Sequence, residues 1–165
     1  MGKEKKGENK IRKLAGNHPR MRMFFLKHLP MAFLAGLKIT EIDNAKASVT
    51  VPYKYLNQNP FRSVYFAVLS MAAELSTGIL AMAAIDDYDV AVSMLVLDMK
   101  AGFTKKARTK ITFTCQEGKK LSAAVAKSIE TGEGQTAEVM TIGLDEEGDE
   151  VARFYFTWTF KPKRS

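Results

Sequence analysis

The stretch VYFAVLSMAAELSTGILAMAAI, residues 64–85, decides how this sequence folds. It is long, rich in small and apolar side chains, and Glu74 is its only charged residue. Apolar side chains on every side of such a segment predict a helix that is buried on most of its surface. An ionised carboxylate in that environment is costly unless it is paired, hydrogen-bonded or hydrated. Glu74 therefore needs a reason to be there, and a functional role is one such reason.

A membrane-spanning helix is the first alternative for this segment, because its length is adequate. Glu74 lies at its centre, however, with serine, threonine and glycine close by, and no second apolar span follows. The flanking residues also lack a clear basic bias on one side. We therefore expect residues 64–85 to form the core helix of a soluble domain.

The composition is that of one folded domain. The chain has 165 residues, of which 46% are hydrophobic and 26% are charged, and this is ordinary for a globular protein. Cys115 is the only cysteine, so an internal disulfide is excluded and no cysteine cluster can hold a metal. No secretory signal is evident. We expect a cytoplasmic protein without a metal site.

The net charge of +7 is concentrated at the N-terminus. Residues 1–27 hold nine Lys or Arg and two Glu, whereas the remaining chain holds sixteen basic and sixteen acidic residues. A neutral body with a basic tail does not indicate a nucleic-acid-binding domain. We expect residues 1–29 to be a basic arm, partly disordered or helical, that is solvated or contacts an anionic membrane surface or a polyanion. Residues 30–165 should form a single domain.

The remaining pattern predicts an antiparallel sheet around the long helix. Residues 10–29 are basic and amphipathic with an interruption at 17–19, and Pro30 favours a short helix after it. A hairpin turns at residues 43–44. Period-two alternation predicts strands, and residues 121–130 could form a strand or a short helix. The expected strands cover residues 38–43, 45–53, 90–100, 105–117, 135–144 and 151–161.

These elements predict an α+β protein in which a long central helix is wrapped by a curved antiparallel sheet of five or six strands. We expect strands 90–100 and 105–117 to pair with each other. The alternating aromatic side chains of residues 154–160 should be buried in the core or at a dimer interface.

The residues from Asn59 to Gly78 resemble the signature of hotdog-fold acyl-CoA thioesterases, in the branch named for phenylacetic acid degradation. That signature has a loop Asn, then His-Gly-Gly opening the helix, then an acid and a Gly four residues later. Asn59, Glu74 and Gly78 fall on the Asn, the acid and the later Gly, whereas residues 65–67 are Tyr-Phe-Ala.

The loop Asn-Pro-Phe-x-Ser followed by Ala-Ala-Glu resembles more closely an uncharacterised thioesterase-like hotdog family, known only as a domain of unknown function. The order of elements agrees with these families from about residue 30 to residue 161.

The resemblance implies a hotdog fold and an acyl-CoA thioesterase-like activity. Glu74 would act as base or nucleophile, since burial raises the pKa of a carboxyl group, and Asn59 would hold the water or the carbonyl. Backbone N–H groups at Tyr65, Phe66 and Ala67 would face the developing oxyanion. The side chains that replace the glycines would crowd the substrate.

The resemblance also implies where the rest of the substrate lies and how subunits assemble. Ser70, Thr77 and Gly78 share the helix face of Glu74 and would contact substrate. Basic side chains at Lys105, Lys106 and Arg108 would meet the phosphates of coenzyme A. Coenzyme A enters only as part of the substrate, so no separate cofactor is implied. A homodimer or dimer of dimers is expected, with the site at the subunit boundary.

Structural interpretations stay open for these residues. Glu74 could reach solvent or pair with a basic side chain, Tyr65 could be a core aromatic, and Asn59 could only shape a turn. The basic residues at 105–108 could be a solvated strand edge. The alternative functions are a non-catalytic acyl-CoA or lipid-binding hotdog protein and a membrane-peripheral module led by the basic arm.

Overall fold

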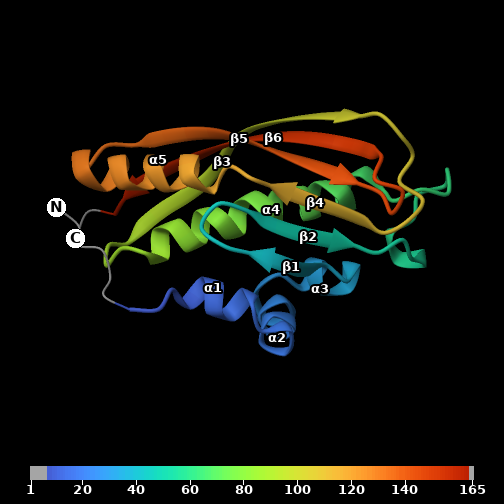
Figure 1. The fold of residues 1–165 in the computed structure, drawn as a ribbon, viewed down its shortest axis with the longest axis horizontal. Helices are drawn as coiled ribbons and strands as arrows, with labels where there is room; N and C mark the ends of the chain where they lie inside the picture. Colours follow the sequence, from blue (N-terminus) through green and yellow to red (C-terminus); the bar gives the residue numbers. More distant parts are fainter. Residues whose placement is uncertain (1–6, 164–165) are drawn as a thin grey trace.

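The computed structural model describes residues 7–163, which form one long helix wrapped by one curved sheet (Figure 1). Helix α4 (Phe66–Asp86) lies against one face of a six-stranded antiparallel sheet. The strands follow one another across the sheet as β1 (Lys38–Ile42), β2 (Ala47–Val51), β4 (Ile111–Cys115), β5 (Gln135–Leu144), β6 (Glu150–Pro162) and β3 (Val92–Phe103). This confirms the predicted α+β hotdog architecture, including the bounds of the helix to within two residues.

Helix α4 is buried because its small side chains let the sheet approach closely. Ala72, Ala73 and Ala81 are fully enclosed. By length and composition α4 could cross a membrane, but most of it is covered by the rest of the chain, as expected for a core helix. The opposite wall of the core comes largely from β6, whose inward side chains are Phe154, Phe156, Trp158 and Phe160. The prediction that this aromatic series is buried is confirmed.

The expected pairing between strands 90–100 and 105–117 is wrong. Strand β3 pairs with β6, from Val92 opposite Pro162 to Phe103 opposite Ala152. Strand β4 is shorter than predicted and pairs with β2 and β5. A period-two pattern predicts which face of a strand is buried but does not identify its neighbours, and adjacency of consecutive strands is only a tendency. Strand β3 therefore stands at one edge of the sheet, and β4 stands in its middle.

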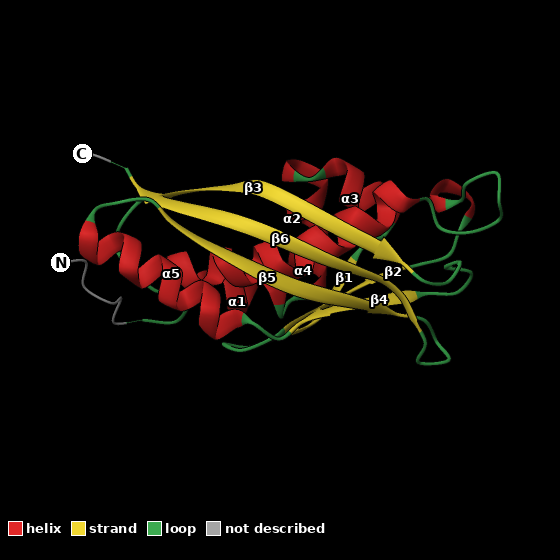
Figure 2. Cartoon of the chain, turned by 90° about the horizontal axis from the view of Figure 1, so that it is seen from above, coloured by secondary structure: helices red, strands yellow, loops and turns green. Residues whose placement is uncertain are grey.

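The segment after β4 is a helix, which decides the alternative left open by the sequence. Helix α5 (Gly118–Thr131) buries Leu121, Val125 and Ser128, at the spacing of one helical face. It packs against α4 and β5, and it covers one end of the sheet (Figure 2).

Three helices precede the sheet: α1 (Lys10–Ala15), α2 (His18–His28) and α3 (Pro30–Ala35). Gly16 and Asn17 separate α1 from α2. The interruption predicted at 17–19 is thus correct only at Asn17, because His18 and Pro19 open α2 and proline is tolerated in the first turn of a helix. Helix α1 is tied to the end of α4 because the Arg12 guanidinium donates to both oxygens of Asp87, at 2.9 and 2.8 Å. Gly36 ends α3 with φ 76°, in the left-handed region that favours glycine. The expected disorder of the arm falls partly on residues 1–6, which lie outside the described residues.

A short 3₁₀ helix, η1 (Tyr55–Asn57), and the loop that follows it lead into α4. The side chain of Asn57 is buried and donates to Ala35 O at 2.9 Å and to Pro52 O at 2.8 Å. Its own backbone carbonyl accepts the N–H of Tyr65 at 2.7 Å. Asn57 therefore joins α3 and the end of the hairpin through its side-chain amide, and the start of α4 through its backbone carbonyl.

Candidate active site

Glu74 lies on the third turn of α4, where its carboxyl group is largely withdrawn from water. Burial raises the pKa of Glu74 above its ordinary value of 4.5. Within residues 7–163 its carboxylate makes no hydrogen bond and no ion pair with protein. The structural interpretation in which Glu74 pairs with a basic side chain therefore has no support among these residues. A carboxylate in this state can accept a proton or attack an electrophile.

Gly78 leaves room for the Glu74 side chain one turn further along the helix. A Cβ at position 78 would lie 3.3 Å from Glu74 Oε1 and 3.3 Å from Cζ2 of Trp158. Thr77 holds the same indole, because its hydroxyl accepts the Trp158 N–H at 3.0 Å and donates to the Glu74 carbonyl at 2.9 Å. Thr77 and Gly78 are buried. The geometry places both behind Glu74, where they set its position.

Two hollows flank Glu74. The sheet-edge hollow, of about 460 Å³, lies between α4 and the edge of the sheet and is lined by Phe66, Ala67, Ser70, Met71, Glu74, Val96, Met99 and Phe156. The helix hollow, of about 220 Å³, lies toward α2 and α3 and is lined by His28, Leu29, Pro30, Met31, Ala32, Leu37, Met71, Glu74 and Leu75. Glu74 and Met71 line both, so the carboxylate stands between the two spaces.

A register shift in β3 shapes the sheet-edge hollow. The pairing with β6 slips between Val96 and Asp98, and Val96 and Met99 on either side of the slip both line the hollow. Bulges commonly re-aim side chains beside functional sites. Because β3 is an edge strand, this wall of the hollow lies at the border of the sheet.

The first turn of α4 supplies unpaired donors to the sheet-edge hollow. The N–H groups of Phe66 and Ala67 have no acceptor among the described residues, whereas the N–H of Tyr65 is taken by Asn57. A helix start carries partial positive charge and free N–H groups. Of the three residues predicted to face an oxyanion, Phe66 and Ala67 therefore keep free donors. The Ser70 hydroxyl in the same hollow donates to the Phe66 carbonyl at 2.9 Å.

Asn59 belongs to a third space, the loop hollow, of about 480 Å³. Its side-chain oxygen accepts from Phe61 N at 3.0 Å, Ser63 N at 3.2 Å and Ser63 Oγ at 3.1 Å. The oxygen therefore holds the loop, and the amide nitrogen has no protein partner among residues 7–163. The loop hollow is lined by Asn59, Pro60, Phe61, Ser63, Val64, Tyr65, Phe66, Leu69, Phe103, Thr104, Lys105, Lys106 and Ala107.

Asn59 and Glu74 do not line the same hollow. Phe66 borders both the loop hollow and the sheet-edge hollow, and its ring lies 5.0 Å from that of Tyr65 and 6.4 Å from that of Phe103, measured between centroids. Aromatic side chains thus stand at the helix start, where Tyr65 and Phe66 fall on the His and the first Gly of the His-Gly-Gly signature. Phe66 is therefore shared by the hollow that Asn59 lines and the hollow that Glu74 lines.

The three predicted coenzyme A contacts differ in their surroundings. Lys105 reaches Asp145 at 2.7 Å, Glu147 at 2.9 Å and Asp149 at 2.7 Å, and these bonds raise the pKa of Lys105 well above its usual range. Lys106 lies over the Phe61 ring, 6.0 Å from its centroid, and forms no ion pair with described residues. Arg108 is exposed and does not line the loop hollow.

Sequence reasoning missed several residues around Glu74. It placed His28 in the arm, away from the domain, yet His28 and Met31 line the helix hollow. It also gave no role to Met71, Val96 and Met99. Val96 and Met99 come from β3, whereas His28, Met31 and Met71 come from three different helices. An apolar residue in a strand looks the same in sequence whether it faces a core or a cavity. The asparagines of the loop were the only local signal for the role of Asn57.

The family described as Domain of unknown function (DUF4442) matches residues 18–160. No curated protein matches the chain. Among solved structures, a Pseudomonas aeruginosa protein of unknown function described as a probable thioesterase has a TM-score of 0.73 at 17% identity, covering 88% of this chain and 96% of that one. A Haemophilus influenzae thioesterase has a TM-score of 0.65 at 15% identity, with 88% and 91% covered.

The PaaI protein from the phenylacetic acid degradation operon of E. coli is also similar. Its TM-score is 0.61 at 15% identity, and 94% of this chain and 97% of that chain are covered. Likeness at such identities shows the fold, which is that of hotdog proteins bearing thioesterase names.

Proposed function

Because the chain belongs to the DUF4442 family and has the hotdog fold, we propose that it is an acyl-CoA thioesterase-like hydrolase. The observation that carries the proposal is the Glu74 carboxylate, which is largely buried and unpaired among the described residues, in the same hollow as two free helix N–H groups. Burying an unpaired carboxylate destabilises the folded state. Thioester hydrolysis would use the carboxylate as base or nucleophile and the N–H groups as donors to the oxyanion.

In the proposed reaction the thioester carbonyl oxygen points at the N–H groups of Phe66 and Ala67. These donors and the positive end of α4 stabilise the oxyanion that forms as the carbonyl is attacked. Glu74 either takes a proton from the attacking water or attacks the carbonyl itself and forms an anhydride that water then opens. The C–S bond breaks in both routes, and the sulfur leaves as a thiolate that takes up a proton.

The acyl and coenzyme A portions of the substrate fit the two hollows that meet at Phe66. The apolar lining of the sheet-edge hollow suits an acyl group. The loop hollow has Lys106 at its side with no carboxylate partner among described residues, so Lys106 suits a coenzyme A phosphate better than Lys105 does. Arg108 stays the more distant of the three candidates.

Dimerisation is a further part of the proposal. Strand β3 is twelve residues long, lies at an edge of the sheet and leaves Leu95 and Leu97 more than 60% exposed. Long apolar edge strands invite pairing with another chain. A second copy at this edge would also close the sheet-edge hollow on its Val96 and Met99 side.

Replacing Leu97 by Lys tests this assembly, because a charge on an edge strand opposes strand pairing. We expect sedimentation of the unmodified chain at micromolar concentration to give a dimer or dimer of dimers, and L97K to shift it toward monomer. A monomeric unmodified chain would contradict a two-subunit site.

A cytoplasmic location is also part of the proposal. It is supported by the cysteine content, because Cys115 is the single cysteine of the sequence and disulfides are rare in reducing compartments.

A non-catalytic acyl-CoA or lipid-binding protein is the second candidate. It is favoured by the exposed Tyr65 and Phe66 rings at the helix start, which narrow the approach of a thioester to the N–H donors.

A screen of acyl-CoA substrates of increasing chain length separates the two functions. Release of free coenzyme A is followed with a thiol reagent, and binding of a non-hydrolysable thioether analogue is measured in parallel. The proposal expects turnover of at least one substrate together with analogue binding. Analogue binding without turnover of any substrate would establish the binding protein instead.

A further inference from the structure

The N-terminal helices combine exposed apolar side chains with an uninterrupted excess of positive charge. Residues 10–40 contain seven Lys or Arg and neither Asp nor Glu. Helix α2, helix α3 and the residue between them expose five large apolar side chains, and we call these residues, with the interspersed basic ones, the N-terminal face. It consists of Arg20, Arg22, Met23, Leu26, Lys27, Leu29, Met31 and Leu34.

The N-terminal face is carried by a fixed scaffold. Met21 and Phe25, on the opposite side of α2, are buried in the core at 3% and 1% exposure. The end of α3 is held where Lys54 Nζ donates to the Leu34 carbonyl at 2.6 Å. Met23 is 65% exposed on the outward side of α2. In Figure 1, α2 lies on the far side of the molecule from β5 and β6. The apolar side chains are therefore held on the outside of the domain, where they are exposed to water.

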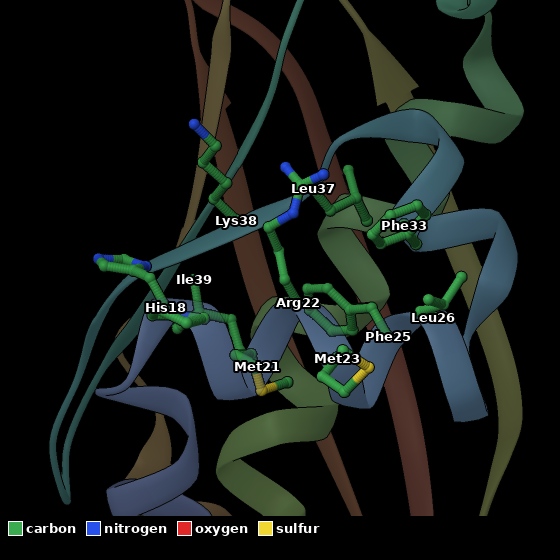
Figure 3. A pocket seen from close by; sticks show the side chains of 11 residues that line it. His18, Met21, Arg22, Met23, Phe25, Leu26, Phe33, Leu37, Lys38 and Ile39 are labelled. Carbon is green, nitrogen blue, oxygen red and sulfur yellow. The ribbon is translucent and has the colours of Figure 1, made fainter.

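A groove of about 700 Å³ runs along this face between α2, α3 and β1 (Figure 3). Arg22 lies over the Phe33 ring, 4.9 Å from its centroid, and Lys38 and His18 stand at its other border. No acidic side chain lines the groove. Its floor is apolar and consists of Met21, Phe25, Leu37 and Ile39. The groove thus adds apolar surface with a basic rim to the N-terminal face, the combination that the boundary of an anionic bilayer can cover.

We propose that the N-terminal face docks this protein on the surface of an anionic lipid bilayer. A surface-lying helix binds membranes through apolar side chains that enter the boundary of headgroups and acyl chains. Basic residues beside them are attracted to anionic lipids, and each strengthens binding about fivefold. The N-terminal face has both features side by side.

A soluble polyanion such as a nucleic acid explains the observations less well. It would neutralise Arg20, Arg22 and Lys27 but leave the neighbouring aliphatic and methionine side chains in water. Single-stranded nucleic acids bind through exposed aromatic rings on which bases stack, whereas the exposed apolar side chains of this face are Leu and Met. A bilayer is the anionic partner that also covers them.

Co-sedimentation of the full chain with vesicles tests the proposal. One set of vesicles is pure phosphatidylcholine, and the other is phosphatidylcholine and phosphatidylglycerol in equal amounts. We expect binding to the anionic vesicles at low salt, much weaker binding to the neutral ones, and loss of the difference at high salt because screening weakens surface attraction.

Two variants separate the contributions of charge and apolar contact. The triple change R20Q, R22Q and K27Q should weaken binding to anionic vesicles about 100-fold, since three charges are lost. The double change M23S and L26S keeps every charge and should weaken it about tenfold or more, because less apolar surface is buried. Neither set lines the hollows beside Glu74, so hydrolysis of a soluble short-chain thioester should be unchanged in both variants.

The control is the double change K119Q and K127Q, which removes two exposed charges from α5, away from the N-terminal face, and should leave vesicle binding nearly unaltered. Melting temperatures show that each variant is folded. The proposal is overturned if the unmodified chain ignores anionic vesicles at low salt, or if the control weakens binding as much as the triple change does. If the double change M23S and L26S left vesicle binding undiminished, and the variant and the unmodified chain bound heparin equally well, the face would be a general polyanion site instead.

Discussion

The carboxylates at two places in this molecule have opposite environments. At the turn between β5 and β6, Asp145, Glu147 and Asp149 converge on the ammonium group of Lys105, and Lys105 holds the pKa of Asp145 below its usual value. In the middle of α4, Glu74 has no such partner among the described residues and its pKa is raised by burial. The turn uses its charges to hold its shape, whereas the helix holds one carboxylate that is largely buried and unpaired among the described residues.

The largest expected effect is that of Glu74→Gln on turnover. The amide keeps the shape of the side chain but can neither accept a proton nor attack a thioester. Hydrolysis should fall by roughly 10²–10⁴-fold, the usual loss for a general base. Glu138→Gln, on the exposed side of β5, is the matched control and should keep full activity. Steady-state rates on the best substrate of the screen measure both.

The same variant also tests whether Glu74 has a structural role instead. If it were a member of a buried ion pair, Glu74→Gln would lower the melting temperature and leave activity per folded molecule intact. A destabilised but fully active variant would therefore show that Glu74, like the carboxylates around Lys105, stabilises the fold and does not act in catalysis.

Gly78→Ala should have the next largest effect. The added methyl group would lie 3.3 Å from both Glu74 Oε1 and the Trp158 ring, so the flexible carboxylate should move by a few tenths of an ångström. A displacement of this size should lower turnover roughly tenfold. Alanine is favoured over glycine within a helix by about 1 kcal/mol, and this gain offsets the cost of the close contact with Glu74 and Trp158. The free energy of unfolding should therefore change little. Gly134→Ala, where nothing lies within 4 Å, is the control.

The pH dependence of stability should show a smaller effect with a defined sign. Because the native pKa of Glu74 lies above its ordinary value of 4.5, the native state binds the proton more tightly than the unfolded state does. The contribution of Glu74 is therefore most favourable below pH 4.5 and is lost as pH rises through the native pKa. Urea unfolding across this range should show Glu74→Gln gaining stability relative to the unmodified chain as pH rises. If Glu74→Gln instead lost stability relative to the unmodified chain as pH rises, the ionised carboxylate would have to be stabilised by a partner.

Lys105→Gln and Lys106→Gln should give the smallest effects, and these should fall on different measurements. Loss of Lys105 leaves three carboxylates facing one another, so the melting temperature should fall while KM for an acyl-CoA stays nearly the same. Loss of Lys106 should raise KM a few-fold without changing the melting temperature, since charge-assisted contacts to phosphate contribute modestly at exposed positions. The reverse assignment would show that the turn at β5–β6 opens to bind substrate.

Sequence reasoning identified most of the helices and strands because their patterns are local. The run from Val64 to Ile85 predicted α4, and alternation in the last strand predicted the buried aromatic series. The same reasoning failed on the neighbour of β3, because strand pairing depends on how a long chain closes on itself. It also misjudged His28, whose place beside Glu74 follows from the packing of α2 and α3 against α4.

The amino-acid sequence by itself determined the central helix, its single charge and the alternating strands around it, since each follows from residue type and spacing along a few turns or one strand. Only the tertiary structure decided which charges are paired. Lys105 forms ion pairs with acidic residues about forty positions away. Glu74 forms no ion pair with any described residue. Burial and ion pairing of a side chain depend on the residues within a few ångströms of it. Those residues come from segments far apart in the sequence, and their contact cannot be inferred from sequence spacing.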